Sequence, residues 1–293
     1  MVLELYPDPN QTNRCERGQI ERPDAVSAHH LRGIDTCTGE PVPHRPTMNG
    51  SVDELVMTFD RAVVVIPAHN EAANLPKSLT AMVTAAACSS MPVLTVVVLD
   101  ACDDPSIDLA GRFGSDVHFI EVDARNVGAS RAAGFSYARS SCGMERTDES
   151  RIWYATTDAD THVDPDWLIR QTAAGADMVL GVVRIGNWRH LPAAAVRRYL
   201  NAYRAKRRQD GHGHVHGANM GFRAEAYWRV GGFADLPTGE DVDLVRRFEE
   251  HHFVIDRDER LSVTTSARQK GKAPKGFAEY LRRIPRTADR EPA

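Results

Sequence analysis

Long hydrophobic runs are absent from this 293-residue sequence. Its longest apolar stretches, at residues 62–67 and 93–99, fall far short of the roughly 18 residues that a membrane-spanning helix needs. The first residues also lack the basic segment and the apolar core of a signal peptide. We therefore expect a cytoplasmic protein without a transmembrane segment.

Paired cysteines and an excess of either charge are also missing. Five cysteines are scattered without a C-x-x-C pair, which favours reduced thiols over disulfides or a structural zinc. Lysine and arginine total 36 and aspartate and glutamate total 40, so the net charge is −4 and a cationic, nucleic-acid-binding surface is not expected. With 42% hydrophobic and 26% charged residues, the composition is typical of a globular protein.

Two common nucleotide-binding motifs do not occur. No G-x-G-x-x-G follows the first apolar segment, and no G-x-x-x-x-G-K-[S/T] is found anywhere. The sequence gives no support for a Rossmann dinucleotide enzyme or a P-loop NTPase. A nucleotide must be held by other means.

From residue 61 onward, short apolar strands alternate with helical segments. Strands are predicted over 62–66, 93–99, 117–122, 152–157, 178–183 and 214–223. Helices are predicted after Asn74, which can cap a helix with Pro76 in its first turn, over 105–113 and 128–140, from Pro165, and over 192–208 and 239–250. This α/β alternation predicts a mainly parallel sheet covered on both faces, followed by a mixed second half.

Polar and acidic residues follow the first four strands of this pattern, at 67–71, 100–104, 123–126 and 158–160. Ligands of open α/β sheets bind beyond the carboxyl ends of the strands. Each acid alone is explained by helix capping. Four acidic edges on one rim would repel one another, however, and a divalent cation with hydroxyl and imide donors from a ligand would relieve that repulsion.

Asp158 and Asp160 give the sharpest prediction. Alternate residues beyond a strand end can turn two carboxylates toward one hard cation, and Mg²⁺ or Mn²⁺ needs only one or two carboxylates when ligand phosphates complete its shell. The pair fits a metal–diphosphate site, and solvated turn residues are the alternative.

Small residues open the helix predicted over 128–140. Asn126, Gly128 and Arg131 would place backbone N–H groups and a cation where a nucleotide or phosphate could approach. The alternative is that small residues there allow two packed elements to approach closely.

These motifs together resemble the family 2 glycosyltransferases, which have the A-type glycosyltransferase fold. The resemblance covers about residues 62–268 and rests on segments 63–71, 96–100, 126–131, 158–160, 217–223, 231–233 and 239–244. It implies a Rossmann-like nucleotide-binding half at 56–160, continuous with an acceptor-binding half at 161–285. Residues 1–55, which hold six of the sixteen prolines in their first 46 positions, are expected to be a loosely ordered extension, and 286–293 a tail.

The resemblance also implies roles for single residues. Pro67, Asn70 and Glu71 would line the nucleoside pocket, Asp100 would bind the base or ribose, Arg131 would stand near the nucleotide, Asp158 would contact the ribose or sugar, Asp160 would hold the metal, Asp241 would be the catalytic base, and Glu240 would orient the acceptor or the sugar. The activity implied is inverting transfer of one sugar from a uridine or guanosine diphosphate sugar to a hydroxyl acceptor. A first-turn acid favoured by the helix dipole is the alternative explanation of Asp241.

The sequence departs from the family pattern at two points. Asp100 is followed by Ala101 and Cys102, where many relatives carry a second acidic or polar residue. The Q-x-x-R-W signature of the polymerising members is missing, which favours a single transfer over a processive synthase.

Histidines and basic residues in the second half leave further possibilities. His212, His214 and His216 share one face if the strand at 214–223 extends backward, so they could bind zinc, or His216 and Asn219 could border the acceptor or donor-sugar pocket. Basic residues of the helix at 192–208 form a solvated face or an anionic or lipid-linked acceptor surface in peripheral membrane contact. Arg268, in a glycine-containing stretch, could stabilise the leaving group.

Two other functions are compatible with parts of the sequence. Asp158 and Asp160 after an apolar strand are similar to the nucleophile loop of haloacid-dehalogenase-like phosphatases, although that loop lies near the start of their fold. A non-catalytic nucleotide-sugar-binding protein is the third possibility.

Overall fold

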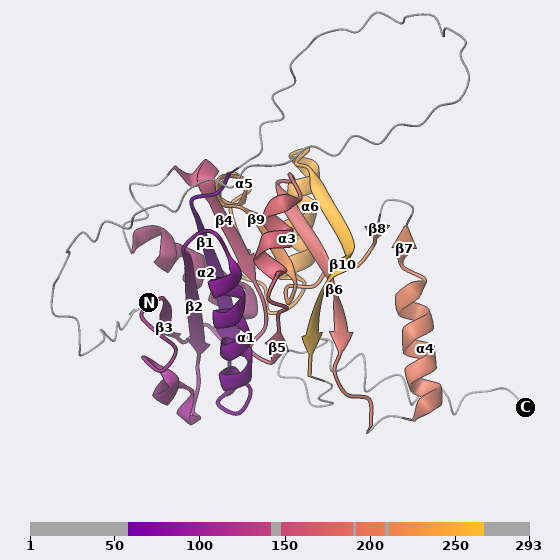
Figure 1. The fold of residues 1–293 in the computed structure, drawn as a ribbon, viewed down its shortest axis with the longest axis horizontal. Coiled ribbons are helices and arrows are strands. Elements are labelled where there is room, and N and C mark those ends of the chain that lie inside the picture. Colours follow the sequence, from indigo (N-terminus) through magenta and orange to yellow (C-terminus); the bar gives the residue numbers. More distant parts are fainter. Residues whose placement is uncertain (1–57, 142–147, 190–191, 209–210, 267–293) are drawn as a thin grey trace, which may run out of the picture. The chain divides into compact units, whose positions relative to one another are not determined.

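A computed structural model describes residues 58–141, 148–189, 192–208 and 211–266 of the chain (Figure 1). Its strands are β1 (Arg61–Ala68), β2 (Val93–Asp100), β3 (Val117–Val122), β4 (Ile152–Thr156), β5 (Thr161–His162), β6 (Met178–Ile185), β7 (Arg207–Arg208), β8 (Gly211–His212), β9 (Met220–Arg223) and β10 (Ile255–Thr265). Its α-helices are α1 (Leu75–Cys88), α2 (Val127–Ser140), α3 (Trp167–Ala173), α4 (Ala193–Arg204), α5 (Ala224–Arg229) and α6 (Glu240–Glu250), with 3₁₀ turns η1 (Pro105–Leu109) and η3 (Glu149–Arg151).

The main sheet has eight strands in the order β3-β2-β1-β4-β9-β6-β10-β5, and β7 and β8 form a separate pair. Strand β1 is parallel to both β2 and β4, whereas β9 is antiparallel to β4 and β6. The chain winds outward from β1 through β2 to β3 and then returns to the other side of β1 as β4. This reversal creates the switch point at which open α/β sheets bind their ligands.

Both faces of the sheet are covered, as the apolar strands predict. Along β1, Val64 and Ile66 pack in a core with α1 and α3, whereas Val63 and Val65 pack in a second core with α2, α5 and α6. Successive side chains of a strand point to opposite faces, so a strand buried on both faces must be apolar throughout. The mixed α/β architecture that the sequence predicts is therefore present.

Two predictions for the first half need correction. The helix predicted over 105–113 is only the short turn η1, because Asp104 caps it by accepting from Ser106 N (3.1 Å) and the chain turns away after Leu109. Helix α1 does carry Pro76 in its first turn, but Asn74 makes no capping hydrogen bond. Its amide donates instead to Glu71 Oε2 (2.7 Å).

The second half departs further from the predicted pattern. The helix expected over 192–208 ends at Arg204, and β7 then pairs with β8. The strand expected over 214–223 forms only at Met220–Arg223. The His214 ring instead contacts the Tyr203 carbonyl through Nε2 (3.0 Å), and the backbone of His214 does not join the sheet.

Several predictions fall on residues outside the described ranges: the extension at 1–55, the tail at 286–293 and the leaving-group role of Arg268. Cys88 and Cys102 are thiols that form no disulfide. None of the helices in the described part of the chain is long and apolar enough to cross a membrane.

Candidate active site

The candidate site lies where β1, β2 and β4 end. Three non-glycine residues with positive φ follow successive strands at this edge: Asn70 (φ 53°) after β1, Ala101 (φ 50°) after β2 and Arg125 (φ 51°) after β3. Such backbone conformations are uncommon for residues other than glycine, and they cluster at functional sites. The edge that the acidic segments predicted thus holds three of the four non-glycine residues with positive φ in the described part of the chain.

Arg131 is the centre of the site. It is 2% exposed, and its guanidinium lies over the ring of Phe233 at 5.7 Å. Its Nη2 donates to Asp158 Oδ1 (2.7 Å), its Nη1 donates to Glu240 Oε1, and its Nε donates to Thr156 Oγ1 (3.1 Å). One buried guanidinium therefore joins the end of β4, at Thr156 and Asp158, to the start of α6 at Glu240.

Gly217 supports this bridge from the segment before β9. A Cβ at this position would stand 2.6 Å from Arg131 Nη2, so only glycine lets the backbone lie against the guanidinium. Its N–H donates to Asp241 Oδ2 (2.9 Å), which fixes that carboxylate beside the bridge. Asp158, Arg131, Glu240 and Asp241 are therefore gathered in one place, as the separate motifs implied.

The two acids that open α6 differ in environment. Glu240 is 5% exposed, and Asp241 is half-buried. Burial raises the pKa of Glu240, and Asp241 and Asp158 act in the same direction, while the Arg131 guanidinium opposes them. Both acids lie in the first helical turn, where the helix dipole favours negative charge.

Asp158 and Asp160 follow β4 as predicted, but their surroundings differ. The Asp158 side chain is 41% exposed, whereas Asp160 is buried against the end of β10. Asp160 Oδ1 accepts from Thr265 Oγ1 (3.4 Å), and its Oδ2 accepts from Ser266 Oγ. No group of three metal-binding side chains occurs among the described residues. The carboxylates of Asp158 and Asp160 fit a cation that takes one or two carboxylates and completes its shell with phosphate and water.

Asp100 is buried and accepts four hydrogen bonds from the chain itself. Its Oδ1 accepts from the backbone N–H groups of Ala124 (2.8 Å) and Arg125 (2.7 Å), and its Oδ2 accepts from Asn126 N (2.9 Å) and Ser130 Oγ (2.7 Å). Because charge-assisted bonds of this kind fix a loop firmly, the contacts of Asp100 favour the positioning of the β3–α2 connection over direct contact with a base or ribose.

Asn126 and Gly128 hold α2 against the segment before α6. The Asn126 side chain caps α2 by accepting from Ala129 N (3.1 Å) and also donates to Asp235 Oδ1 (2.5 Å). A Cβ on Gly128 would lie 2.1 Å from the Ala234 carbonyl oxygen. These contacts favour the alternative of close approach between packed elements over a phosphate cradle.

The loop after β1 contacts the loop after β2. Asn70 accepts from Asp103 N (2.8 Å) and donates to Asp103 Oδ1 (2.5 Å), and Asp104 Oδ2 accepts from Ala72 N (2.8 Å). Glu71 is buried and Pro67 is half-buried. Asp103 and Asp104, the acids that follow Cys102, therefore hold the loop after β1 in place beside the predicted nucleoside pocket.

Asn219 is fully buried, and both ends of its amide are engaged. Its Oδ1 accepts from Trp167 Nε1 (2.8 Å), and its Nδ2 donates to the carbonyls of Val182 (2.9 Å) and Leu261 (3.0 Å). These bonds tie α3, β6 and β10 together, so both polar ends of the Asn219 side chain are used within the fold.

Sequence reasoning assigned no role to Gly217, Thr156 or Ser266. Gly217 lies in segment 217–223, on which the family resemblance rests, and the lack of a Cβ in glycine was the signal that could have identified it. Thr156 and Ser266 gave none, because a buried threonine on a strand and a serine after one are common.

An open α/β sheet whose ligand edge lies at the switch point of the strand order is the architecture of the A-type glycosyltransferase fold. The model of the glycosyl transferase family 2 matches residues 63–231, and the chain belongs to that family.

Solved structures agree with this fold. The mannosyltransferase PcManGT from Pyrobaculum calidifontis, in complex with GDP-Man and Mn²⁺, matches with a TM-score of 0.55 and 18% identity over 81% of this chain and 66% of its own. Residues 1–349 of TarS from S. aureus, in complex with UDP-GlcNAc, match with a TM-score of 0.53 and 13% identity over 78% of this chain and 65% of that one. The chain thus spans about two thirds of their length. No curated protein sequence matches it.

Proposed function

We propose that the protein transfers one sugar from a nucleoside diphosphate sugar to a hydroxyl acceptor, with inversion at the anomeric carbon. The observation that carries the proposal is the gathering of Asp158, Arg131, Glu240 and Asp241 at the carboxyl edge of the sheet. Membership of family 2 supports the same activity. The neighbours solved with UDP-GlcNAc and GDP-Man support a uridine or guanosine diphosphate sugar as donor.

Asp241 is the base in this proposal. A neutral hydroxyl is a weak nucleophile, so Asp241 accepts the acceptor's proton while the oxygen forms a bond to the anomeric carbon. The bond between that carbon and the diphosphate oxygen breaks, and the nucleoside diphosphate leaves with the electron pair. Gly217 N–H donates to one oxygen of Asp241 and Val242 N–H to the other (2.8 Å), and lone pairs remain on both to take the proton.

Glu240 and Arg131 orient the site. Glu240 is held by the guanidinium and is buried, so it is suited to hold a sugar or acceptor hydroxyl at a fixed distance from Asp241. Arg131 also keeps Asp158 in place on the donor side, and its positive charge reduces the mutual repulsion of the carboxylates around it.

Asp160 and Asp158 would hold a divalent cation, Mn²⁺ or Mg²⁺, together with the diphosphate. When bound, the ion neutralises the charge that develops on the departing diphosphate. The hydroxyls of Thr265 and Ser266 steady Asp160 at this place.

The Asp241→Asn variant tests the assignment of the base. It should lower kcat by about 10²–10⁴-fold and leave the dissociation constant of the donor almost unchanged, because the lost proton acceptor acts only in the transition state. Asp243→Asn is the matched control, since Asp243 lies in the same helix turn but pairs with Arg246 and Arg247. Equal turnover in the Asp241 and Asp243 variants would refute the assignment.

A haloacid-dehalogenase-like phosphatase is excluded by the family to which the chain belongs. Within the described residues, Asp158 and Asp160 follow the fourth strand and not the first. A non-catalytic nucleotide-sugar-binding protein remains the contrasting outcome of the test: it would bind the donor and release no product.

A further inference from the structure

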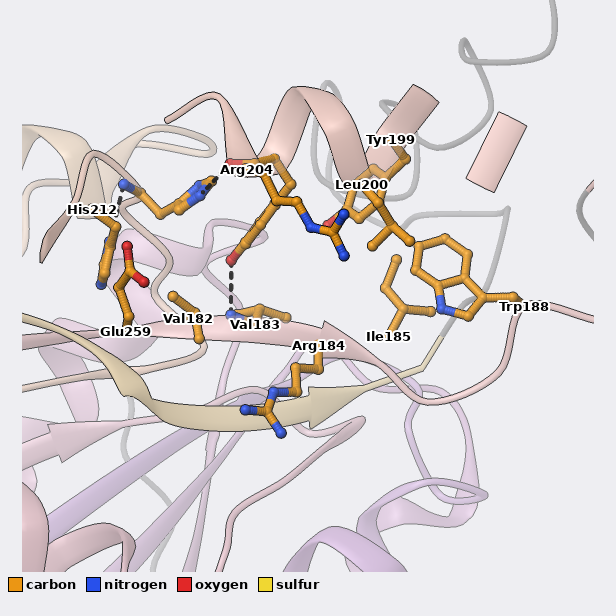
Figure 2. Close-up of a pocket in the computed structure, with 12 residues that line it drawn as sticks. Val182, Val183, Arg184, Ile185, Trp188, Tyr199, Leu200, Arg204, His212 and Glu259 are labelled. Atoms are coloured by element: carbon orange, nitrogen blue, oxygen red, sulfur yellow. Dashed lines mark hydrogen bonds between the residues drawn. The ribbon is translucent and has the colours of Figure 1, made fainter. Parts of the chain in front are cut away.

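A cavity of about 380 Å³ lies between α4, the second half of β6 and the segment that carries the three histidines (Figure 2). Figure 2 shows Trp188, Ile185 and Leu200 together at one end and His212 and Glu259 at the other. At about 30 Å³ for each non-hydrogen atom, the cavity has room for roughly a dozen such atoms. That is enough for one small ligand or the head of a larger one.

Three aromatic side chains of the cavity wall, those of His212, His214 and Tyr203, use polar side-chain atoms within the protein itself. His212 uses both ring nitrogens internally, on the Leu180 carbonyl (3.1 Å) and His214 N (3.1 Å). His214 Nε2 contacts the Tyr203 carbonyl (3.0 Å), and the Tyr203 hydroxyl accepts from Val183 N (2.9 Å).

Two of these rings stack on each other, and two further rings of the lining lie close together. The Tyr203 and His214 centroids lie 3.6 Å apart at 15°, and Trp188 and Tyr199 extend the aromatic wall at 5.1 Å. Burial lowers the pKa of His214 to about 4, so its ring is neutral at pH 7. The His214 ring therefore contributes aromatic surface instead of positive charge.

The residues that line the cavity include two arginines, Arg204 of α4 and Arg184 of β6, and one acid, Glu259. Figure 2 shows the Arg204 guanidinium beside Leu200, in the space between the helix and Val183 of β6. A cation among ring faces favours a ligand that is flat, largely apolar and negatively charged at one edge.

The cavity is connected to the proposed catalytic base by a short segment. The Tyr203 hydroxyl lies 3.3 Å from His216 Nε2, and the next residue, Gly217, donates its N–H to Asp241. On the other wall, the Val182 carbonyl accepts from Asn219, three residues after His216. A ligand in the cavity would therefore contact Tyr203 and Val182, whose partners His216 and Asn219 flank the residue that holds Asp241.

We propose that this cavity binds the acceptor, and that the acceptor is a hydroxyl-bearing aromatic compound with an acidic group that pairs with Arg204. The inference rests on the proposed transfer function and names the acceptor class for that site. It replaces the membrane-facing interpretation of α4, because Tyr199, Leu200 and Tyr203 line the cavity.

Calorimetric binding of 6-hydroxy-2-naphthoate, a flat aromatic acid with a hydroxyl group, tests the inference. Leu200→Trp fills the cavity and should weaken binding more than tenfold, whereas Ala202→Trp adds the same ring to an exposed position of α4 and should leave binding unchanged. Arg204→Gln, an exposed substitution that leaves the fold intact, should weaken binding roughly threefold through loss of the cation.

Three results would overturn the inference: no binding to the unmodified protein, equal binding by the Leu200 and Ala202 variants, or binding of methyl β-D-glucopyranoside in preference to the naphthoate. Release of nucleoside diphosphate by the unmodified protein, measured in the same samples, judges the transfer function separately. Absence of that release contradicts the proposed function, while the binding pattern still decides what the cavity takes.

Discussion

Removal of the buried guanidinium is the perturbation with the largest consequence for both stability and site geometry. The Arg131→Met variant keeps most of the side-chain volume, but it leaves the Glu240 carboxylate, at 5% exposure, without the cation that compensates its charge. Breaking a buried pair by removing one partner costs about 3–5 kcal/mol. That is a large share of the 5–15 kcal/mol by which domains are typically stable.

Urea unfolding measured by tryptophan fluorescence gives the assay. With a slope of about 2 kcal/mol per M, the midpoint should fall by roughly 1.5–2.5 M at pH 7.5. Arg246→Met is the matched control, because its pairs with Asp243 and Glu250 are exposed on the surface of α6, and it should cost less than about 1 kcal/mol.

The pH dependence separates a lost ion pair from simple loss of packing. A carboxyl whose pKa is higher in the folded than in the unfolded state binds a proton on folding, so the folded state loses stability as the pH rises through that range. Burial raises the pKa of Glu240, and loss of Arg131 removes what opposes it. The deficit of the Arg131 variant should therefore shrink from pH 7.5 to pH 5. A deficit equal to that of the Arg246 variant, or one independent of pH, would refute the reasoning.

Three further predictions concern the site and its surroundings. Gly217→Ala places a Cβ 2.6 Å from Arg131 Nη2 and should lower both turnover and stability, the latter by about 1–3 kcal/mol. Unchanged turnover and an unchanged urea midpoint would contradict the close fit of Gly217 against Arg131. Asp160→Asn should weaken donor binding more than tenfold with Mn²⁺ present, and calorimetry showing the same affinity with and without Mn²⁺ in the unmodified protein would remove its metal role. With a pKa of about 4 in the folded state, His214 binds fewer protons there than in the unfolded state between pH 6.5 and 4, so it makes the free energy of unfolding fall as the pH falls. His214→Phe should therefore reduce the pH dependence of the free energy of unfolding in this window. An unchanged pH dependence in urea titrations would count against this prediction.

The parallel half of the fold was predictable because its strands are short, largely apolar runs separated by helical segments. Residues 117–122 were predicted as a strand and form β3 without change. The second half was less accessible, since its short strands depend on contacts between distant residues. No local sequence pattern indicates that His214 would stack on Tyr203, or that the strand would be limited to Met220–Arg223.

The site divides in the same way. Acidic residues after strands could be located from sequence, because the carboxyl ends of parallel strands meet at one edge. Their partners could not, since the bond from Arg131 to Glu240 and the close approach of Gly128 to Ala234 join segments about a hundred residues apart. The cytoplasmic location and the boundaries of the nucleotide-binding and acceptor-binding halves stay predictions.

Acceptor-independent turnover of a panel of nucleoside diphosphate sugars with Mn²⁺ is the most direct test of the central claim. The account predicts slow release of nucleoside diphosphate from a uridine or guanosine diphosphate sugar, lost in Asp160→Ala and strongly reduced in Asp241→Asn. Release of inorganic phosphate from a phosphomonoester, or donor binding without any release of nucleoside diphosphate, would contradict it.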